Sequence, residues 1–203
     1  MYRTKLRWNS MHMPAFIEKY QDKEKFIVFC RECHNYGNRW SCPPLSMNTE
    51  DFLQQFSQIY LFGTQVIYTE ETRSSADTKE KVQNITRTSL QTVKQHMQTN
   101  ILHTEKQTPG SVSFASGSCS ICPVCTRPEN KPCRHPDKMR HSLDSFGFDL
   151  TAITQDLMQV SLHWSHGELP EYYLLVHALL CREPLPQERL EQLLEALRSL
   201  QEG

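Results

Sequence analysis

The chain has 203 residues, 38% hydrophobic residues and a mean hydropathy of −0.58, which suits a soluble globular protein of one domain, or one domain with an appendage. Its 22 Lys and Arg against 23 Asp and Glu give a net charge of −1, without the basic excess of a general nucleic-acid binder. The longest apolar stretch, Tyr172–Cys181, is too short to span a membrane. The N-terminal segment MYRTKLRWNSMHMP lacks the apolar core of a secretory signal, so we expect a cytoplasmic protein.

The first part of the chain alternates helical and extended patterns. Pro14–Tyr20 is predicted to form a short helix, because its apolar residues share one helical face. Phe26–Phe29 (FIVF) has the pattern of a short buried strand that ends at the first cysteine. A helix capped by Asn48 or Thr49 is expected to continue to Gln58.

The central part contains the longest predicted elements. Ile59–Thr69 is rich in β-branched and aromatic residues and predicts the longest strand. Thr72–Asp77 has the composition of a polar loop, and a long amphipathic helix is expected from about Thr78 to His103. Val112 and Phe114 alternate with polar residues, which predicts a short strand before the second group of cysteines.

The last part predicts a helix over Leu150–Trp164, a strand buried on both faces over Tyr172–Leu180, and a helix over Pro184–Leu200 with leucines along one side. The alternation of elements favours an α/β fold: a small mixed sheet flanked by helices, with two cysteine-rich metal-binding loops. We expect residues 1–183 to form this cysteine-rich domain. Residues 184–203 are expected to add a C-terminal amphipathic helix that packs on the same domain.

Eight cysteines carry the chemistry of the sequence, and seven of them fall into two groups. In a reducing compartment, cysteines this close together indicate metal ligands or redox groups rather than disulfides. The second group reads C-x2-C-x2-C-x7-C and contains Cys119, Cys122, Cys125 and Cys133. Bacterial ferredoxins use the same short gaps around an iron–sulfur cluster, whereas zinc ribbons pair two C-x2-C units across a longer loop. The pattern therefore indicates a metal site and favours a four-iron four-sulfur (4Fe-4S) cluster over zinc.

Basic residues lie beside the last cysteine of this second group: Lys131, Arg134, Lys138 and Arg140. A cluster held by four thiolates carries negative charge, so these side chains either neutralise the cluster or an anionic ligand, or they are solvated surface charges.

The first group reads C-x2-C-x8-C-P-P and contains only Cys30, Cys33 and Cys42. A fourth ligand could come from His34 or from Cys181, or one iron could stay open to substrate or solvent and act as a Lewis acid. Zinc held by the three cysteines and His34 is the alternative. Cys181 itself ends an apolar strand, where a small buried core residue is expected.

The segments Cys30–Pro44 and Cys119–Pro136 resemble those of a bacterial and archaeal family of predicted metal-binding proteins, labelled as domain of unknown function twenty-two eighty-four. The similarity continues into Ser142–Asp149, where the pair Asp144-Ser145 replaces the Glu-Ala expected in the family. The resemblance covers about residues 14 to 180. It implies metal binding, with iron–sulfur as the expected form, through the seven cysteines of the two groups, and it implies no particular reaction.

Three functions follow as alternatives. The first is a redox protein that carries one or two 4Fe-4S clusters and passes electrons to a partner protein. The second is an iron–sulfur enzyme with an open iron at Cys30, Cys33 and Cys42, acting on a small-molecule substrate, with Arg39, Trp40 and His34 in the same loop. The third is a zinc-stapled, non-catalytic binding module. A pocket that reaches the three-cysteine group would favour the enzyme over a pure electron carrier. No nucleic-acid or membrane partner is indicated.

Overall fold

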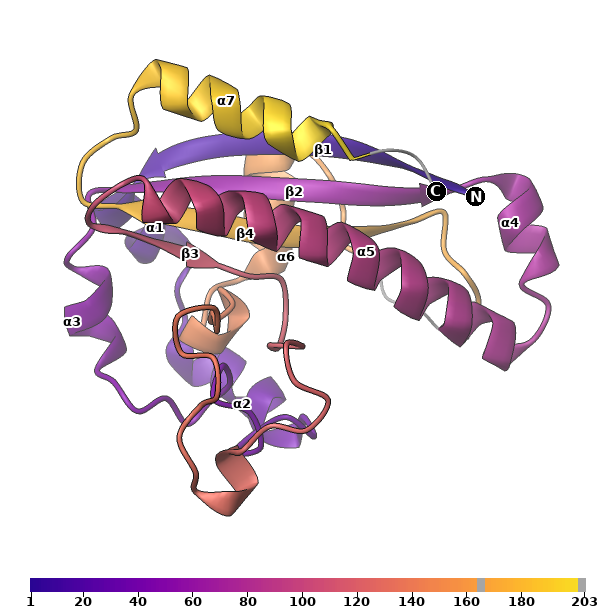
Figure 1. Cartoon of the computed structure of the whole chain (residues 1–203), viewed down its shortest axis with the longest axis horizontal. Coiled ribbons are helices and arrows are strands. Elements are labelled where there is room, and N and C mark those ends of the chain that lie inside the picture. The colour runs from indigo at the N-terminus through magenta and orange to yellow at the C-terminus, as the bar shows by residue number, and fades with distance from the viewer. Residues whose placement is uncertain (164–166, 201–203) are drawn as a thin grey trace.

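The computed structural model describes residues 1–163 and 167–200 and shows a four-stranded sheet covered by helices (Figure 1). The strands lie in the order β1-β2-β4-β3, with the bounds β1 Tyr2–His12, β2 Gln58–Tyr68, β3 Ser111–Phe114 and β4 Tyr172–Cys181. Every strand pairing within the described residues is antiparallel. The expected α/β class, with a small sheet flanked by helices, is confirmed, and the sheet is antiparallel rather than mixed.

The described residues also form seven α-helices and two short 3₁₀ turns. Their bounds are α1 Met13–Tyr20, α2 Lys23–Glu32, α3 Thr49–Leu53, α4 Glu70–Ser75, α5 Lys79–Lys106, α6 Leu150–Met158, α7 Gln187–Arg198, η1 Arg127–Glu129 and η2 Asp144–Phe146. None of these helices is long and apolar enough to cross a membrane within the part of the chain that the structure describes.

One face of the sheet is covered by α5 and α7 (Figure 1). Val93, Met97 and Ile101 recur along α5 at helical spacing and are almost completely buried against the sheet. Leu193 and Leu197 of α7 are buried in the same core. The two amphipathic helices predicted from the sequence therefore form and cover the sheet with their apolar sides.

The other face is covered by α1, α3, α6 and η2, and aromatic rings fill the space between them. The rings of Phe114 and Phe146 lie 4.8 Å apart and those of Phe16 and Phe148 lie 4.9 Å apart. Such pairs stabilise a core beyond their buried area. This core supports the cysteine-bearing segments, which lie with α2 at one end of the molecule, away from α7 (Figure 1).

The prediction of a buried strand at Phe26–Phe29 is wrong, because these residues lie within α2. Asp22 caps the helix by accepting a hydrogen bond from the Lys25 N–H, and charged residues flank the apolar run on both sides. None of the residues of α2, all of which the structure describes, is buried. A local cap therefore decides the structure of a run whose composition resembles that of a strand.

Four other elements differ from what the sequence analysis expected. β1 was not predicted, although its burial alternates along an edge strand that carries Arg3, Lys5 and Arg7. The segment expected to be a polar loop forms most of α4, capped by Thr69. The helix capped by Asn48 ends at Leu53 rather than at Gln58, which already belongs to β2. The helix expected over Leu150–Trp164 ends already at Met158, where Gln159 takes a left-handed φ of +54°; Trp164 itself lies outside the described residues.

Candidate metal centre

The first group of cysteines lies where α2 ends. Cys30 belongs to the last turn of the helix, and the Cys33 N–H donates to the Cys30 carbonyl as the helix stops. The chain then turns back, and the Gly37 N–H donates to the Pro43 carbonyl at 2.8 Å. Gly37 has a φ of +68°, which glycine adopts without strain. This turn, residues 30–42, is called the three-cysteine loop below.

The second group follows β3 in an irregular segment, residues 119–133, called the four-cysteine loop below. Its longer interval, between the third and fourth cysteines, is closed by a turn around buried Thr126. The Thr126 hydroxyl donates to the Pro132 carbonyl at 2.9 Å, and the Lys131 N–H donates to the Thr126 carbonyl at 3.2 Å. The turn brings Cys133 back toward the three earlier cysteines.

The four cysteines of this loop line one common cavity with Arg39 and Trp40. Backbone donors already point at two of the sulfurs: the His135 N–H lies 3.4 Å from Cys133 Sγ, and the backbone of Ile121 hydrogen-bonds Cys119. Burial raises the pKa of the Cys119 thiol, while this hydrogen bond and the Lys94 ammonium act in the opposite direction. Hydrogen bonds of this kind stabilise thiolates that hold a metal.

Cys30, Cys33 and Cys42 line a second and much larger cavity of about 690 Å³, called the α2 cavity below. Burial raises the pKa of Cys30 to about 11, and the negative charges of Asp144 and of the other two thiols raise it further. In the apoprotein the Cys30 thiol is therefore protonated near neutral pH, and a bound metal would have to displace its proton.

The structure brings neither expected fourth ligand to the three-cysteine loop. His34 is exposed and does not line the α2 cavity. Cys181 is 1% exposed and lies in the core beneath α5 and α7, where burial raises its pKa to about 12, as expected for a core cysteine. Asp144 of η2 does line the cavity. Its segment was singled out from the sequence, but the sequence did not show that it faces the cysteines.

Direct hydrogen bonds join the two loops. Ser41 Oγ accepts the Cys119 N–H at 2.9 Å and lies 3.6 Å from Cys42 Sγ, so one hydroxyl touches both cysteine groups. Arg39 donates to the Cys119 carbonyl at 2.8 Å. Arg127 reaches back from the four-cysteine loop and donates to the carbonyls of Arg39 and Cys42. The two groups therefore form one continuous site.

The positive charges at the site differ from those expected. Lys131 pairs with exposed Glu129, whereas Arg134 does line the four-cysteine cavity and donates to the Val124 carbonyl. The further cations are Arg39, in the wall of that cavity, and Lys94 of α5. Lys94 donates to the Ser118 carbonyl at 2.6 Å; burial lowers its pKa, and the charges of Cys119 and Asp144 oppose this shift.

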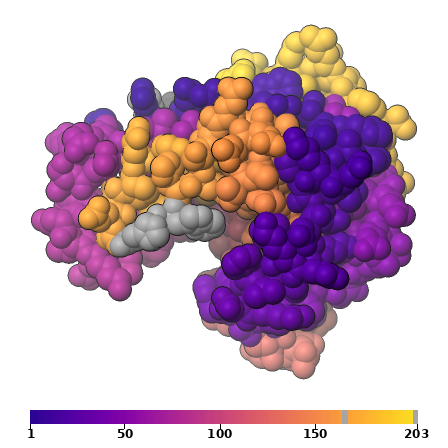
Figure 2. Space-filling model, turned by 180° about the vertical axis from the view of Figure 1, so that it is seen from behind, coloured from indigo at the N-terminus to yellow at the C-terminus, as the bar shows by residue number. Residues whose placement is uncertain are grey.

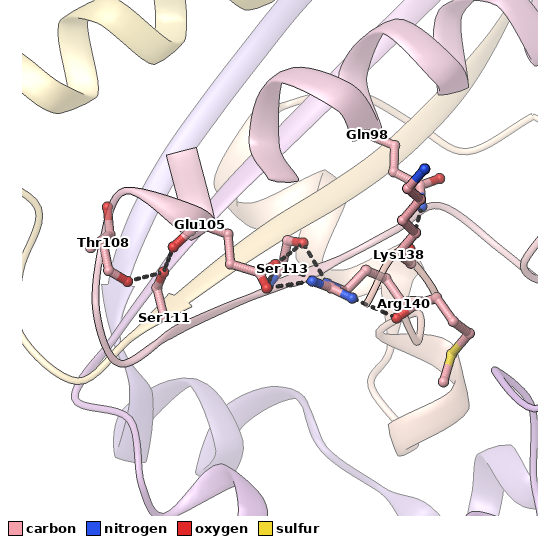
Figure 3. Close-up of polar contacts among 8 residues, drawn as sticks. Gln98, Glu105, Thr108, Ser111, Ser113, Lys138 and Arg140 are labelled. Carbon is pink, nitrogen blue, oxygen red and sulfur yellow. Dashed lines mark hydrogen bonds and ion pairs between the residues drawn. The ribbon is translucent and has the colours of Figure 1, made fainter. Parts of the chain in front are cut away.

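The C-terminal end of the cysteine-bearing segment is anchored by a nearly buried ion pair (Figure 3). Arg140 donates from Nε and Nη2 to the two carboxylate oxygens of Glu105, and the side chains are only 12% and 13% exposed. Ser113 of β3 donates its backbone N–H to the same carboxylate at 2.8 Å. The Gln98 amide, about two turns before Glu105 on α5, donates to the Lys138 carbonyl. Arg140 is thus a structural anchor to α5 and β3.

The donor set suits a metal group, although no three of the described His, Cys, Asp and Glu side chains are close enough to hold a single ion. The thiols of each group instead surround a shared cavity. The sequence model of a family described as "Predicted metal-binding protein (DUF2284)" matches residues 17–177, a range that contains both loops. Searches of curated proteins and of solved structures find no match.

Proposed function

Because the chain belongs to this family of predicted metal-binding proteins, we propose that Cys119, Cys122, Cys125 and Cys133 hold a 4Fe-4S cluster that serves in electron transfer. The observation that carries the proposal is that all four thiols line one cavity, from a sequence spacing that suits a cluster better than a zinc ribbon. Around a single zinc ion, sulfurs at about 2.3 Å from the metal lie about 3.8 Å from one another, so they close tightly on one point. A cluster holds its four thiolates farther apart.

The chain's own residues support this role. A bound cluster would supply a one-electron couple, taking an electron from a reduced donor and giving it to an oxidised acceptor. The Ile121 backbone hydrogen-bonds Cys119 and the His135 N–H donates to Cys133 Sγ, contacts of the kind that support thiolate ligands once a metal is bound. Val124 between two of the cysteines is 67% exposed, so the loop is directly accessible to a partner protein. Electron transfer to a docked protein requires such a position near the surface.

A second candidate function is favoured by the α2 cavity. An enzyme needs a space next to its reactive group, and Cys30, Cys33 and Cys42 all line a cavity of about 690 Å³. Three thiolates without a fourth protein ligand would leave one iron of a cluster open to a small-molecule substrate. Under this proposal the four-cysteine group relays electrons to the three-cysteine group, with Ser41 in contact with both.

The metal content of the protein tests the first proposal. The full chain is purified without oxygen, and iron, acid-labile sulfide and zinc are measured on one sample. We expect about four irons and four sulfides per chain for one cluster, or about eight of each for two. Zinc without sulfide would overturn both iron–sulfur proposals and favour a zinc-stapled binding module.

Cysteine variants assign the metal to its loop. Cys122→Ala should remove the iron of the four-cysteine loop, and Cys33→Ala should remove only iron bound at the three-cysteine loop. Cys181→Ala is the matched control, because this thiol lies in the core beneath α5 and α7. The ligand assignment is wrong if Cys122→Ala keeps all its iron or if Cys181→Ala loses it.

A further inference from the structure

The α2 cavity has walls of two kinds, and together they indicate the chemistry of a ligand. Phe26 and Phe29 of α2 give the cavity an apolar lining together with Phe148 and Leu150. The remaining wall contains the cysteines and short polar side chains such as Ser142. A volume of about 690 Å³ lies in the range that small-molecule sites occupy. In the space-filling view, this side of the molecule is hollowed between the purple lobe and the orange segments (Figure 2).

The charge of the cavity is one-sided. Among its lining residues that the structure describes, Asp144 is the only Asp, Glu, Lys, Arg or His. Any thiolate at Cys30, Cys33 or Cys42 would add negative charge. Lys94 interacts electrostatically with Asp144, but it does not line the cavity and its ammonium donates to the Ser118 carbonyl. A phosphate or carboxylate would therefore find no cationic partner on the described walls.

Asp144 also has an unused acceptor. Its Oδ1 is buried and has no hydrogen-bond partner among the described residues. An under-bonded carboxylate is costly, and a ligand in the cavity whose N–H group donates to an accessible part of the Asp144 carboxylate would offset part of this cost. The aromatic side chains that line the cavity suit the apolar body of such a ligand. The Phe26 ring already has the Lys25 ammonium 4.9 Å from its centroid, so a ligand cation would rely on Asp144 rather than on this ring.

We propose that the α2 cavity binds a small cationic amine with an aromatic body, whose ammonium group donates to Asp144 and whose ring packs between α2 and Phe148. The cavity discriminates against anions of the same shape. The inference that this ligand is a substrate bound beside the three cysteines rests on the second proposed function. The binding of the amine itself requires only the chain's own residues.

Three probes with one ring system and different charges test the proposal: tryptamine, indole and indole-3-acetate. Binding of each to the anaerobically purified full chain is measured by isothermal titration calorimetry. We expect tryptamine to bind about tenfold more tightly than indole, as one charge-assisted hydrogen bond gives, and indole-3-acetate to bind most weakly. Equal affinities, tighter binding of the anion, or no binding of any probe would overturn the proposal.

Two variants locate the binding. Asp144→Asn should reduce the affinity for tryptamine about tenfold and leave that for indole unchanged. Thr151→Trp fills the cavity from the exposed side of α6 and should weaken both probes. Glu195→Gln on the exposed side of α7 is the control with unchanged binding. If Asp144→Asn does not fold, Thr151→Trp alone decides, and unchanged binding there contradicts the proposal.

Iron and sulfide are measured on the same samples, so the two proposals fail separately. A chain with its clusters that shows no preference for tryptamine refutes the ligand inference alone. A chain that binds tryptamine through Asp144 but contains no sulfide refutes the iron–sulfur proposal alone.

Discussion

The ion pair between Arg140 and Glu105 offers the sharpest test of how the cysteine-bearing segment is held. In Glu105→Ala the guanidinium of Arg140 stays nearly buried without its carboxylate, and the Ser113 N–H loses its acceptor. Removing one partner of a buried pair costs about 3–5 kcal/mol, and an orphaned buried N–H costs about 1–3 kcal/mol, with overlap between the two. We therefore expect the free energy of unfolding to fall by about 4 kcal/mol, which urea-induced unfolding measures.

Two further variants separate this effect from a general loss of charge. Glu129→Ala removes the exposed partner of Lys131 in the same segment and should cost under about 1 kcal/mol. The double variant Glu105→Met with Arg140→Met replaces both charges by apolar side chains and should recover the part of the loss that comes from the unpaired guanidinium, whereas the Ser113 N–H stays without its carboxylate acceptor. A loss below about 1 kcal/mol for Glu105→Ala would refute the reasoning, because it would show that the pair is solvated.

Three other changes have defined outcomes. Gly147→Ala should lower the free energy of unfolding in urea by about 2–3 kcal/mol, because φ is +79° and the new Cβ would lie 2.7 Å from the Lys23 backbone. Gly117→Ala also has a positive φ but open space around it, so it should cost only about 1 kcal/mol. Equal losses in the two variants would contradict the close approach at Gly147. Burial and the charge of Lys94 lower the pKa of His177 from 6.5 to about 3, so only the unfolded chain takes up this proton as the pH falls below 6.5. The free energy of unfolding should thus decrease by up to roughly 1.4 kcal/mol per pH unit as the pH falls from 6.5 to 3. In His177→Leu this dependence on pH should be weaker, and identical slopes for both proteins would refute the reasoning. In Arg127→Lys a single ammonium replaces the guanidinium that donates from the four-cysteine loop to the carbonyls of Arg39, Cys42 and Pro44, so iron retained after chelator challenge should decrease. Unchanged retention would show that this bridge is not needed.

The sequence predicts well those elements whose pattern is long. β2, β4, α5 and α7 each bury a regular set of apolar side chains, so periodicity alone identifies them. It fails at α2, where four apolar residues in a row suit a strand or a helix equally and the Asp22 cap decides. It also fails at β1, whose charged edge carries little hydrophobic signal.

Some residues of the candidate site follow from the local sequence pattern, and others depend on the tertiary structure. Cys119, Cys122 and Cys125 are identified by local spacing, which needs no knowledge of the fold. Ser41 and Asp144 are missed as site residues because their role depends on contacts across the tertiary structure. From the sequence, Arg140 is expected either to neutralise the cluster or an anionic ligand or to be a solvated surface charge; its nearly buried pairing with Glu105 also depends on the tertiary structure and does not follow from the sequence.

The most direct test of the central claim is electron paramagnetic resonance of the anaerobic full chain after reduction with dithionite. The account predicts the signal of a reduced 4Fe-4S cluster, lost in Cys125→Ala, or reduced by one cluster where the three-cysteine loop holds a second, and retained in Cys181→Ala. A chain without any such signal and without sulfide, or an undiminished signal in Cys125→Ala, would contradict it.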